Sequence, residues 1–226
     1  MQFRTLLTST ICAASIALPA LAARPDRHDS LDEVIKRVQA QQKQTRTIQS
    51  DFWQQKTVAL LAKPEAASGR FVYSAPTSVL WSYDAPKRVQ MLIANGMLTT
   101  YYPDLNKAEK IEVKGYQDRI FKYMGASGAI DDLATFFSFT FSNAADKPEY
   151  VLDLQPKTKG IAKRVKHIRI WIDKKTSFTS KFEYTEADGD LTRYEFSNVR
   201  INQPVEQGRF TLALPNSVRV EQMKLQ

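Results

Sequence analysis

The residue types that most often carry catalysis or bind metals are few in this chain and lie far apart. The chain contains one cysteine, Cys12, and two histidines, His28 and His167. It has no H-E-x-x-H or G-x-S-x-G sequence, no pair of cysteines and no glycine-rich phosphate loop. Metal sites and activated nucleophiles need such groups together at defined spacing. The sequence therefore predicts no metal, no cofactor and no enzymatic activity.

Two pairs of carboxylates remain as candidates for acid–base chemistry. Asp131 and Asp132 stand where a short helix is predicted to begin, and acids in the first turn of a helix are stabilised by its dipole. Asp188 and Asp190 flank a glycine in a predicted hairpin turn. Both pairs have a structural explanation, so neither is predicted to be catalytic.

Apolar residues at two-residue spacing are the more informative pattern. Residues 69–103 read GRFVYSAPTSVLWSYDAPKRVQMLIANGMLTTYYP, with aromatic pairs at Phe71 and Tyr73 and at Trp81 and Tyr83. Side chains two residues apart project from the same face of a strand. These strands therefore present aromatic rings on one face, and the functional question is what those rings cover.

Some strands are apolar on both faces. Met91-Leu92-Ile93 and residues 168–172 (IRIWI) do not alternate with polar residues, as a strand with one wet face would. One face is then expected to meet the core, while the other lines a cavity or lies under helices. An apolar cavity would suit a hydrophobic ligand. A fully packed β-core explains the same pattern equally well.

The first half of the chain is predicted to form a helix followed by a β-meander. Ser30 and Glu33 form a capping box, and apolar residues at helical spacing extend the helix from Leu31 to about Lys43. A long strand is expected from Ile48 to Leu61, and another from Lys110 to Lys114. The Asn95-Gly96 pair predicts a tight hairpin turn between them.

The second half is predicted to resume the strands after an inserted segment. Residues 115–146 break the pattern, with a short helix expected at 131–137 and four phenylalanines at 136–141 that must pack on something apolar. A basic run from Lys157 to Arg169 falls in a predicted hairpin, either solvated or docked on an acidic partner or an anionic membrane. The remaining strands are predicted at Tyr150–Leu154, Val165–Ile172, Phe178–Thr185, Leu191–Ile201, Phe210–Leu212 and Ser217–Met223. About eleven strands in a single domain, residues 23–226, are expected.

Residues 1–22 have the pattern of a secretory signal peptide. Arg4 precedes a short apolar run from Leu6 to Leu18, and Ala20-Leu21-Ala22 fits the small-x-small cleavage pattern. The run is shorter than the roughly 20 apolar residues of a transmembrane helix. We therefore expect an exported, periplasmic protein that is cleaved near Ala22.

Export would decide whether the cysteine is kept and which partners the positive charge can meet. Cleavage near Ala22 removes Cys12, so the mature protein would have no disulfide or thiol chemistry. Ile11 is bulky where lipid attachment to Cys12 would need a small residue. The formal net charge of +8 would fall by one with the loss of Arg4. An exported basic protein meets lipid head groups, polysaccharide or acidic proteins, so no nucleic-acid partner is expected.

An ordered set of short sequences carries a resemblance to a known family. In chain order they are Gly69-Arg70-Phe71, Ala75-Pro76, Trp81-Ser82-Tyr83, Pro86, Asn95-Gly96, Tyr101-Tyr102-Pro103, Leu154-Gln155-Pro156-Lys157 and Phe210-Thr211-Leu212. A signal peptide and an amphipathic helix, leading into a strand that ends near Gln54-Gln55, precede them. Together they resemble the LolA family, periplasmic carriers of outer-membrane lipoproteins, over the whole mature chain.

The resemblance implies a mainly β fold, an incomplete antiparallel β-barrel whose open side is covered by a helical lid. The cavity would hold the acyl chains of a lipoprotein, taken from an inner-membrane ABC lipoprotein-release complex and passed to an outer-membrane lipoprotein receptor. A monomer is expected. By position, the residues implied to line the cavity are Phe71, Tyr73, Val79, Trp81, Tyr83, Met91 and Ile93. The residues implied for the lid are Ile130, Leu133, Phe136 and Phe137.

One departure from the family pattern keeps another cargo open. Many family members carry an arginine before the first proline of the motif, where it holds the lid, but this chain has Ala75 there. Leu80 is likewise apolar where arginine is frequent. The lid would then close through apolar contact, or the cargo would be another lipid.

Two other classes are disfavoured. For an exported hydrolase, the chain lacks a nucleophile–base set. The strands of an outer-membrane barrel would alternate over about ten residues without an inserted helix.

A charge at Val79 is expected to impair cargo binding and to leave the fold intact.

Overall fold

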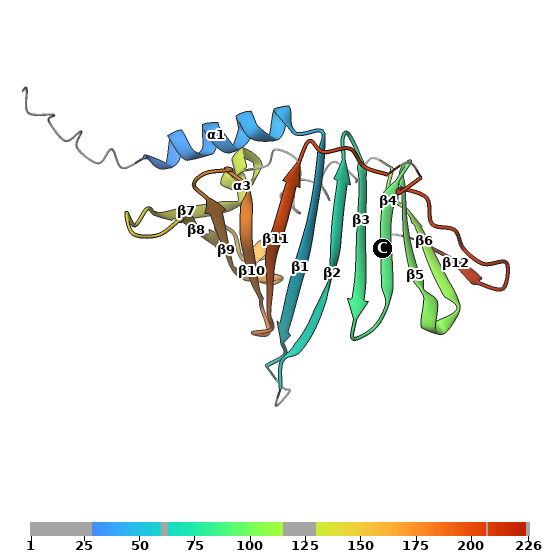
Figure 1. Cartoon of the computed structure of the whole chain (residues 1–226). Coiled ribbons are helices and arrows are strands. Elements are labelled where there is room, and N and C mark those ends of the chain that lie inside the picture. The colour runs from blue at the N-terminus through green and yellow to red at the C-terminus, as the bar shows by residue number, and fades with distance from the viewer. Residues whose placement is uncertain (1–28, 60–62, 115–129, 207, 225–226) are drawn as a thin grey trace, which may run out of the picture.

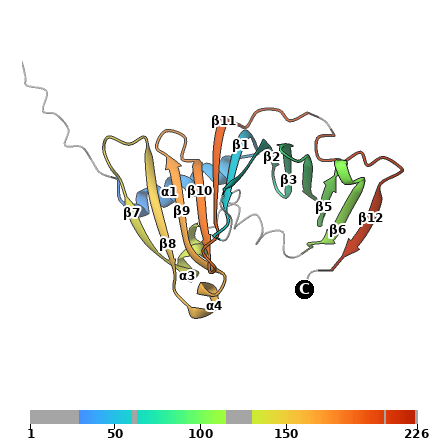
Figure 2. The ribbon, with the colours of Figure 1, turned by 90° about the horizontal axis from the view of Figure 1, so that it is seen from below.

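A single 12-stranded sheet in the order β12-β6-β5-β4-β3-β2-β1-β11-β10-β9-β8-β7 makes up most of the molecule (Figure 1). The structure is a computed structural model and describes residues 29–59, 63–114, 130–206 and 208–224. The predicted signal peptide lies outside the described residues. Figure 2 shows the sheet end-on as an open curve, with β7 and β12 at its two ends. The mainly β fold with an unclosed barrel, which the sequence predicted, is confirmed.

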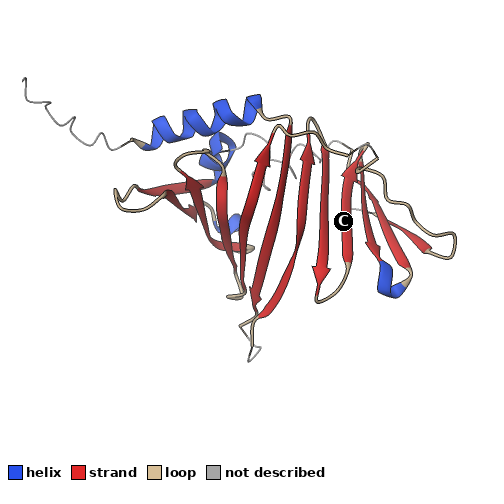
Figure 3. Cartoon of the chain, in the orientation of Figure 1, coloured by secondary structure: helices blue, strands red, loops and turns tan. Residues whose placement is uncertain are grey.

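The elements have the following bounds. The strands are β1 Thr47–Thr57, β2 Glu65–Ser74, β3 Ser78–Ala85, β4 Val89–Ala94, β5 Met97–Tyr102, β6 Lys107–Glu112, β7 Phe137–Ser142, β8 Glu149–Pro156, β9 Val165–Asp173, β10 Thr179–Glu186, β11 Leu191–Ile201 and β12 Arg219–Met223. The helices are α1 Leu31–Gln44, η1 Pro103–Leu105, α3 Ile130–Phe136 and α4 Lys159–Ala162. In Figure 3 the strands, in red, account for most of the described chain.

Strands β1 to β6 form the predicted antiparallel meander, each paired with its neighbour in sequence. Asn95 and Gly96 join β4 to β5 with φ angles of 53° and 78°. A two-residue hairpin of this kind needs positive φ at both central positions, which this dipeptide tolerates best. The first strand ends at Thr57 and not at Leu61.

Strands β7 to β11 form a second antiparallel series, which joins the first because β11 pairs with β1. The predicted strand at residues 191–201 and the turn at Asp188-Gly189 are confirmed. The short helix α4 lies between β8 and β9, where the basic run was predicted to form a hairpin.

Three predictions about strands are wrong. Residues 137–142 (FSFTFS) form β7, because phenylalanine at every second position gives one apolar strand face directly after a helix. Residues 210–212 are not a strand: Phe210 and Leu212 pack, partly buried, against the sheet, but the segment does not pair with it. The last strand, β12, pairs in parallel with β6, so the sheet is not antiparallel throughout. A long connection allows parallel pairing.

Helix α1 begins at its predicted capping box. The backbone N–H of Ser30 donates to the Glu33 carboxylate at 2.9 Å, and the Glu33 N–H donates to the Ser30 hydroxyl at 3.3 Å. Val34 and Val38 are buried against Leu152, Ile170 and other residues of β7 to β9. Helix α1 therefore covers the half of the sheet that contains the second strand series (Figure 1). None of the described helices is long and apolar enough to cross a membrane.

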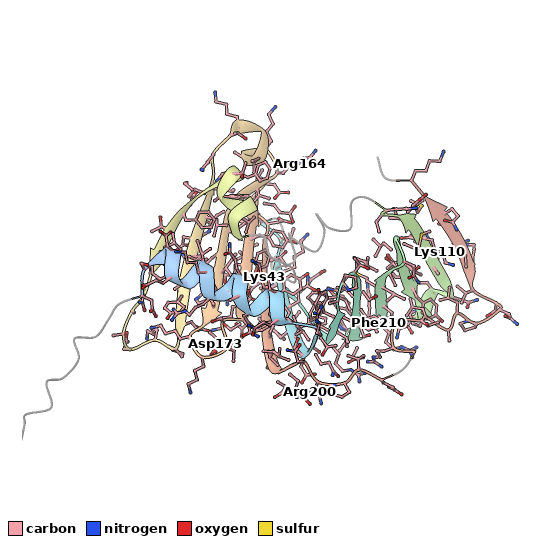
Figure 4. The ribbon with its side chains drawn as sticks, turned by 90° about the horizontal axis from the view of Figure 1, so that it is seen from above. Lys43, Lys110, Arg164, Asp173, Arg200 and Phe210 are labelled. Carbon is pink, nitrogen blue, oxygen red and sulfur yellow. The ribbon has the colours of Figure 1, made fainter. Side chains whose placement is uncertain are left out.

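The opposite face of β2 to β4 carries a separate small core. Val72, Leu80 and Leu92 are buried there beneath Val205, Phe210 and Leu212 of the segment after β11. In Figure 4 the labelled Phe210 lies beside the green strands of the first series. The apolar residues on both faces of these strands are thus explained by a covering chain segment on one side. The predicted cover by helices is found on the other doubly apolar strand, at residues 168–172, where Ile170 and Ile172 pack with Val34 and Val38 of α1.

Gly69 is required by the close approach of β2 and β3. A Cβ placed on Gly69 would lie 1.9 Å from the carbonyl oxygen of Ser82, a backbone atom that only a shift of the strand can move. We expect Gly69→Ala to lower the free energy of unfolding by at least about 2 kcal/mol, measured by urea denaturation. Gly160→Ala is the matched control, because its nearest neighbour is 3.9 Å away. Equal effects at both positions would contradict this account.

Candidate functional site

The strand register brings the seven predicted cavity residues to one face of the sheet. Tyr73 pairs with Val79, and Val79 with Ile93. In the next row Phe71 pairs with Trp81, which pairs with Met91. Gly69 pairs with Tyr83 one row further on. Directly paired residues share a face, so a single surface, called the inner face below, carries all seven.

The inner face continues through β1 into the second strand series. Phe52 pairs with Phe196, and Gln54 with Tyr194. Tyr194 pairs in turn with Phe182, and Phe182 with Ile170. The two halves differ in what lies on them. Side chains of α1 and α3 pack on the β7–β10 half, whereas no helical side chain among the described residues belongs to the cluster on the β1–β6 half.

Trp81 is the centre of an aromatic cluster on the β1–β6 half. Its ring centroid lies 4.7 Å from that of Phe71 and 4.8 Å from that of Phe52. Tyr194 and Phe196 of β11 lie at 5.6 and 6.0 Å. Tilted and edge-on pairs at such distances are mutually attractive. The cluster therefore links strands β1, β2, β3 and β11 into one apolar wall.

Burial divides the predicted cavity residues into two groups. Phe71, Tyr73, Val79 and Ile93 are buried, with Val79 at 0% exposure. Trp81, Tyr83 and Met91 are half-buried, so part of each side chain can be reached by a ligand. Whether the seven form a cargo cavity remains a prediction.

An open pocket of about 500 Å³ lies at one end of this wall. Of the seven predicted residues, Tyr83 and Met91 line it. Its other lining residues are Gln54, Lys56, Glu65, Ala66, Ala67, Pro86, Lys87 and Val89. The pocket lies at the ends of β1 to β4. Its lining depends on the register between these strands, which the sequence alone did not predict.

Phe52, Tyr194 and Phe196 were not among the predicted site residues. Their strands were predicted, but nothing in the sequence indicated that β1 and β11 pair.

Burial raises the pKa of the Tyr83 phenol, and it raises the pKa of Tyr194 further. Both phenols are therefore neutral at physiological pH, and these two residues bring no charge to the wall.

The predicted lid residues do not share one helix face. Leu133 packs against the cluster beneath α1, and Phe137 is buried in it but belongs to β7. Phe136, the last residue of α3, is 41% exposed. The side chain of Ile130 lies outside the described residues. The prediction of one apolar helix face is therefore wrong for Phe136 and Phe137, because the helix ends between them.

Helix α3 is attached to the start of the basic run. The backbone N–H of Lys157 donates to the Phe136 carbonyl at 2.9 Å, and its ammonium group donates to the Ala134 carbonyl at 2.5 Å. These bonds hold the helix against the end of β8. A lid that moves would have to break them.

Ala75, where the family often has arginine, is held by its backbone. Its N–H donates to the Arg46 carbonyl at 2.8 Å, and its methyl group packs against the cluster that contains Val79 and Ile93. Position 75 thus makes an apolar contact in place of a charged one.

The candidate catalytic groups whose side chains the structure describes have structural roles, whereas the side chains of Asp131 and Asp132 lie outside the described residues. His167 and Arg169 both contact the Asp153 carboxylate, at 2.9 and 2.6 Å. Asp188 accepts the N–H of Asp190 at 3.1 Å within the turn. Among the described residues, no three His, Cys, Asp or Glu side chains come together as a metal site would require.

Comparison with known proteins identifies the family. The family model for "Outer membrane lipoprotein carrier protein LolA" matches residues 43–213, which is most of the chain. This protein belongs to the LolA family. A relative from Pseudomonas aeruginosa named outer-membrane lipoprotein carrier protein is 24% identical over 219 residues, covering 96% of this chain and 99% of the relative. One of the same name from Cupriavidus taiwanensis is 27% identical over 231 residues, covering 97% and 99%.

A solved structure shares the fold of this chain. An uncharacterized conserved protein from Thermus thermophilus superposes with a TM-score of 0.55 at 11% identity, covering 85% of this chain and 98% of that one. At this identity the likeness concerns the fold alone.

The full burial of Val79 changes what its substitution tests. Because an ionised carboxylate there would be buried without a partner, we expect Val79→Glu to destabilise the fold by several kcal/mol, on the order of 3 or more. The expectation of an intact fold is therefore withdrawn. Urea denaturation checks this, with Val220→Glu as control because Val220 is 44% exposed. Equal stability of the two variants would show that Val79 is not buried.

Proposed function

We propose that this protein carries outer-membrane lipoproteins across the periplasm, with their acyl chains held against the inner face of β1 to β6. The observation that carries the proposal is the aromatic wall around Trp81. Its rings come from four strands, and no described helix packs on it. The other half of the same face is already occupied by α1 and α3. Membership of the LolA family and the names of the relatives support this function.

The need for such a wall follows from the cost of exposing acyl chains to water. Each methylene transferred from water to an apolar surface gains roughly 0.8 kcal/mol. For a lipid anchor with several chains of about 15 methylenes each, exposure to water would therefore cost tens of kcal/mol, at roughly 0.8 kcal/mol for each methylene. A soluble carrier must offer an apolar surface of its own. In this proposal the carrier acts by binding alone, without catalysis or a cofactor.

The route and the partners belong to the same proposal. We infer that residues 1–22 are a signal peptide, that residues 23–226 form one carrier domain, and that the mature protein works as a monomer in the periplasm. Cargo would come from an inner-membrane ABC lipoprotein-release complex and go to an outer-membrane lipoprotein receptor. A lid role for Leu133, Phe136 and Phe137 would require α3 to leave its bonds to Lys157.

Ala75 is the reason to consider a second class of cargo. Without a charged side chain at this position, closure over the wall would depend on apolar contact, which does not discriminate a lipoprotein from another lipid. A carrier of free periplasmic lipid is therefore the alternative.

The test is to purify the mature protein from its native periplasm and to identify bound molecules by mass spectrometry. Three forms are compared: the wild type, Met91→Glu and Val220→Glu. Met91 lines the pocket, whereas Val220 lies on the edge strand β12. A carboxylate in the apolar wall opposes acyl-chain binding. We expect acylated lipoproteins with the wild type and Val220→Glu, and about a tenfold loss with Met91→Glu.

Two outcomes would count against the proposal. Free lipids without lipoproteins would favour the alternative cargo. Equal recovery of lipoproteins with Met91→Glu and the wild type would place the cargo elsewhere on the molecule.

A further inference from the structure

A dense run of positive charge lies where β8 turns into β9. It consists of Lys157, Lys159, Lys163, Arg164 and Lys166, which are called the α4 tip below. All five side chains are exposed. The chain has no aspartate or glutamate from residue 154 to residue 172, so no acid of the same segment offsets these charges. In Figure 4, nitrogen-ended side chains project away from the sheet around the labelled Arg164.

Helix α4 brings the charges of the tip together. The Thr158 hydroxyl accepts the N–H of Ile161 at 3.4 Å, and the Lys163 N–H donates to the Lys159 carbonyl at 3.1 Å. Ile161 packs against the apolar cluster of β7 to β9. The turn is therefore held to the sheet by its one large apolar side chain, and its basic side chains face solvent.

The neighbouring acids do not neutralise the tip. The β10–β11 turn lies next to it, with a backbone N–H that donates to the Arg164 carbonyl at 3.2 Å. Two acids of that turn, Glu186 and Asp190, contact Lys56 at 3.8 and 3.6 Å, and the third, Asp188, accepts a backbone N–H within the turn. None of the five cations of the tip forms an ion pair with a described residue.

An exposed aromatic ring borders the tip. Phe136 is 41% exposed, and its carbonyl accepts the backbone N–H of Lys157 at 2.9 Å. A single exposed ring needs no explanation by itself. Beside a group of lysines, however, it has the composition of a surface that lies on a bilayer, where apolar side chains enter the head-group region and cations meet the anionic lipids.

The kind of cation favours a lipid surface over an acidic protein. Four of the five residues are lysines. Protein–protein interfaces are depleted in lysine and enriched in arginine, tyrosine and tryptophan. Lysine is a flexible point charge without the fixed fork of arginine. Attraction to a layer of anionic head groups needs charge and no fixed geometry.

The position of the tip suits a carrier. In Figure 2, α4 lies at the margin of the open side of the curved sheet. A bilayer in contact with the tip would therefore face this open side, on which the aromatic wall around Trp81 lies.

We propose that the α4 tip docks the protein on a membrane surface that contains anionic phospholipids. The five cations contact the lipid phosphates, and Phe136 enters the head-group region. The open side of the sheet is then turned toward the bilayer, where a lipid-anchored cargo enters or leaves. This proposal goes beyond the carrier function, because it concerns the membrane and not the cargo.

The test is co-sedimentation of the mature protein with vesicles. One set contains phosphatidylcholine alone, and the other contains an equal mixture of phosphatidylcholine and phosphatidylglycerol. We expect binding to the anionic vesicles only, and weaker binding as salt is added, because salt screens the attraction. Each cation near an anionic surface strengthens binding roughly fivefold. The double variant Lys159→Gln, Lys163→Gln is therefore expected to bind about 25-fold more weakly.

A matched control separates the position of the charge from its amount. The double variant Lys36→Gln, Lys43→Gln removes the same charge from exposed residues of α1, and it should bind the anionic vesicles as the wild type does. Phe136→Ser keeps every cation but removes the ring, and we expect it to bind roughly fivefold more weakly. Circular dichroism confirms that each variant is folded.

The outcomes keep this proposal apart from the carrier function. Equal binding of the wild type to both kinds of vesicle, or equal losses in the two double variants, would overturn it. Absence of binding to either kind would also overturn it and would leave an acidic protein as the partner of the tip. Met91→Glu, which changes the proposed cargo wall, should bind anionic vesicles as the wild type does. A loss there would show that the wall and not the tip contacts the bilayer. None of these results alters the recovery of lipoproteins, which tests the carrier function separately.

Discussion

The structure depends on the alignment of apolar side chains across a sheet that does not close. Each strand places every second residue on the inner face, and the register keeps those residues in rows from β6 to β7. A curved sheet with an apolar concave face must have that face covered. The chain covers one half with α1 and α3 and leaves the aromatic cluster without a described helix. The surface on which the helices pack therefore continues into the surface that we propose for cargo binding.

The two halves of the inner face differ in what packs on them. On the β7–β10 half, Leu152, Leu154 and Ile172 are almost fully buried beneath α1, which gives the fold its permanent core. On the β1–β6 half, aromatic rings pack edge-on against one another around Trp81. The phenols of Tyr83 and Tyr194 are kept neutral there by burial, which suits contact with hydrocarbon.

Local sequence predicted what depends on neighbours in the chain. The capping box at Ser30, the Asn95-Gly96 turn and the bounds of β11 are all encoded within a few residues. Contacts between distant segments were not predictable in this way. Phe52 meets Phe196 only because β1 pairs with β11, and the parallel partner of β12 depends on the path of the long segment before it. The end of α3 was missed because Phe136 and Phe137 continue an apolar run across a change from helix to strand.

Fluorescence quenching by brominated acyl chains tests the central claim, that these chains lie on the inner face of β1 to β6. Of the three tryptophans, Trp81 lies on this face, whereas Trp53 and Trp171 occupy alternate strand positions on the opposite face. Two single-tryptophan proteins are compared, one that keeps Trp81 and one that keeps Trp53. We expect strong, saturable quenching of Trp81 and little quenching of Trp53. Equal quenching of the two, or quenching of Trp53 alone, would contradict it.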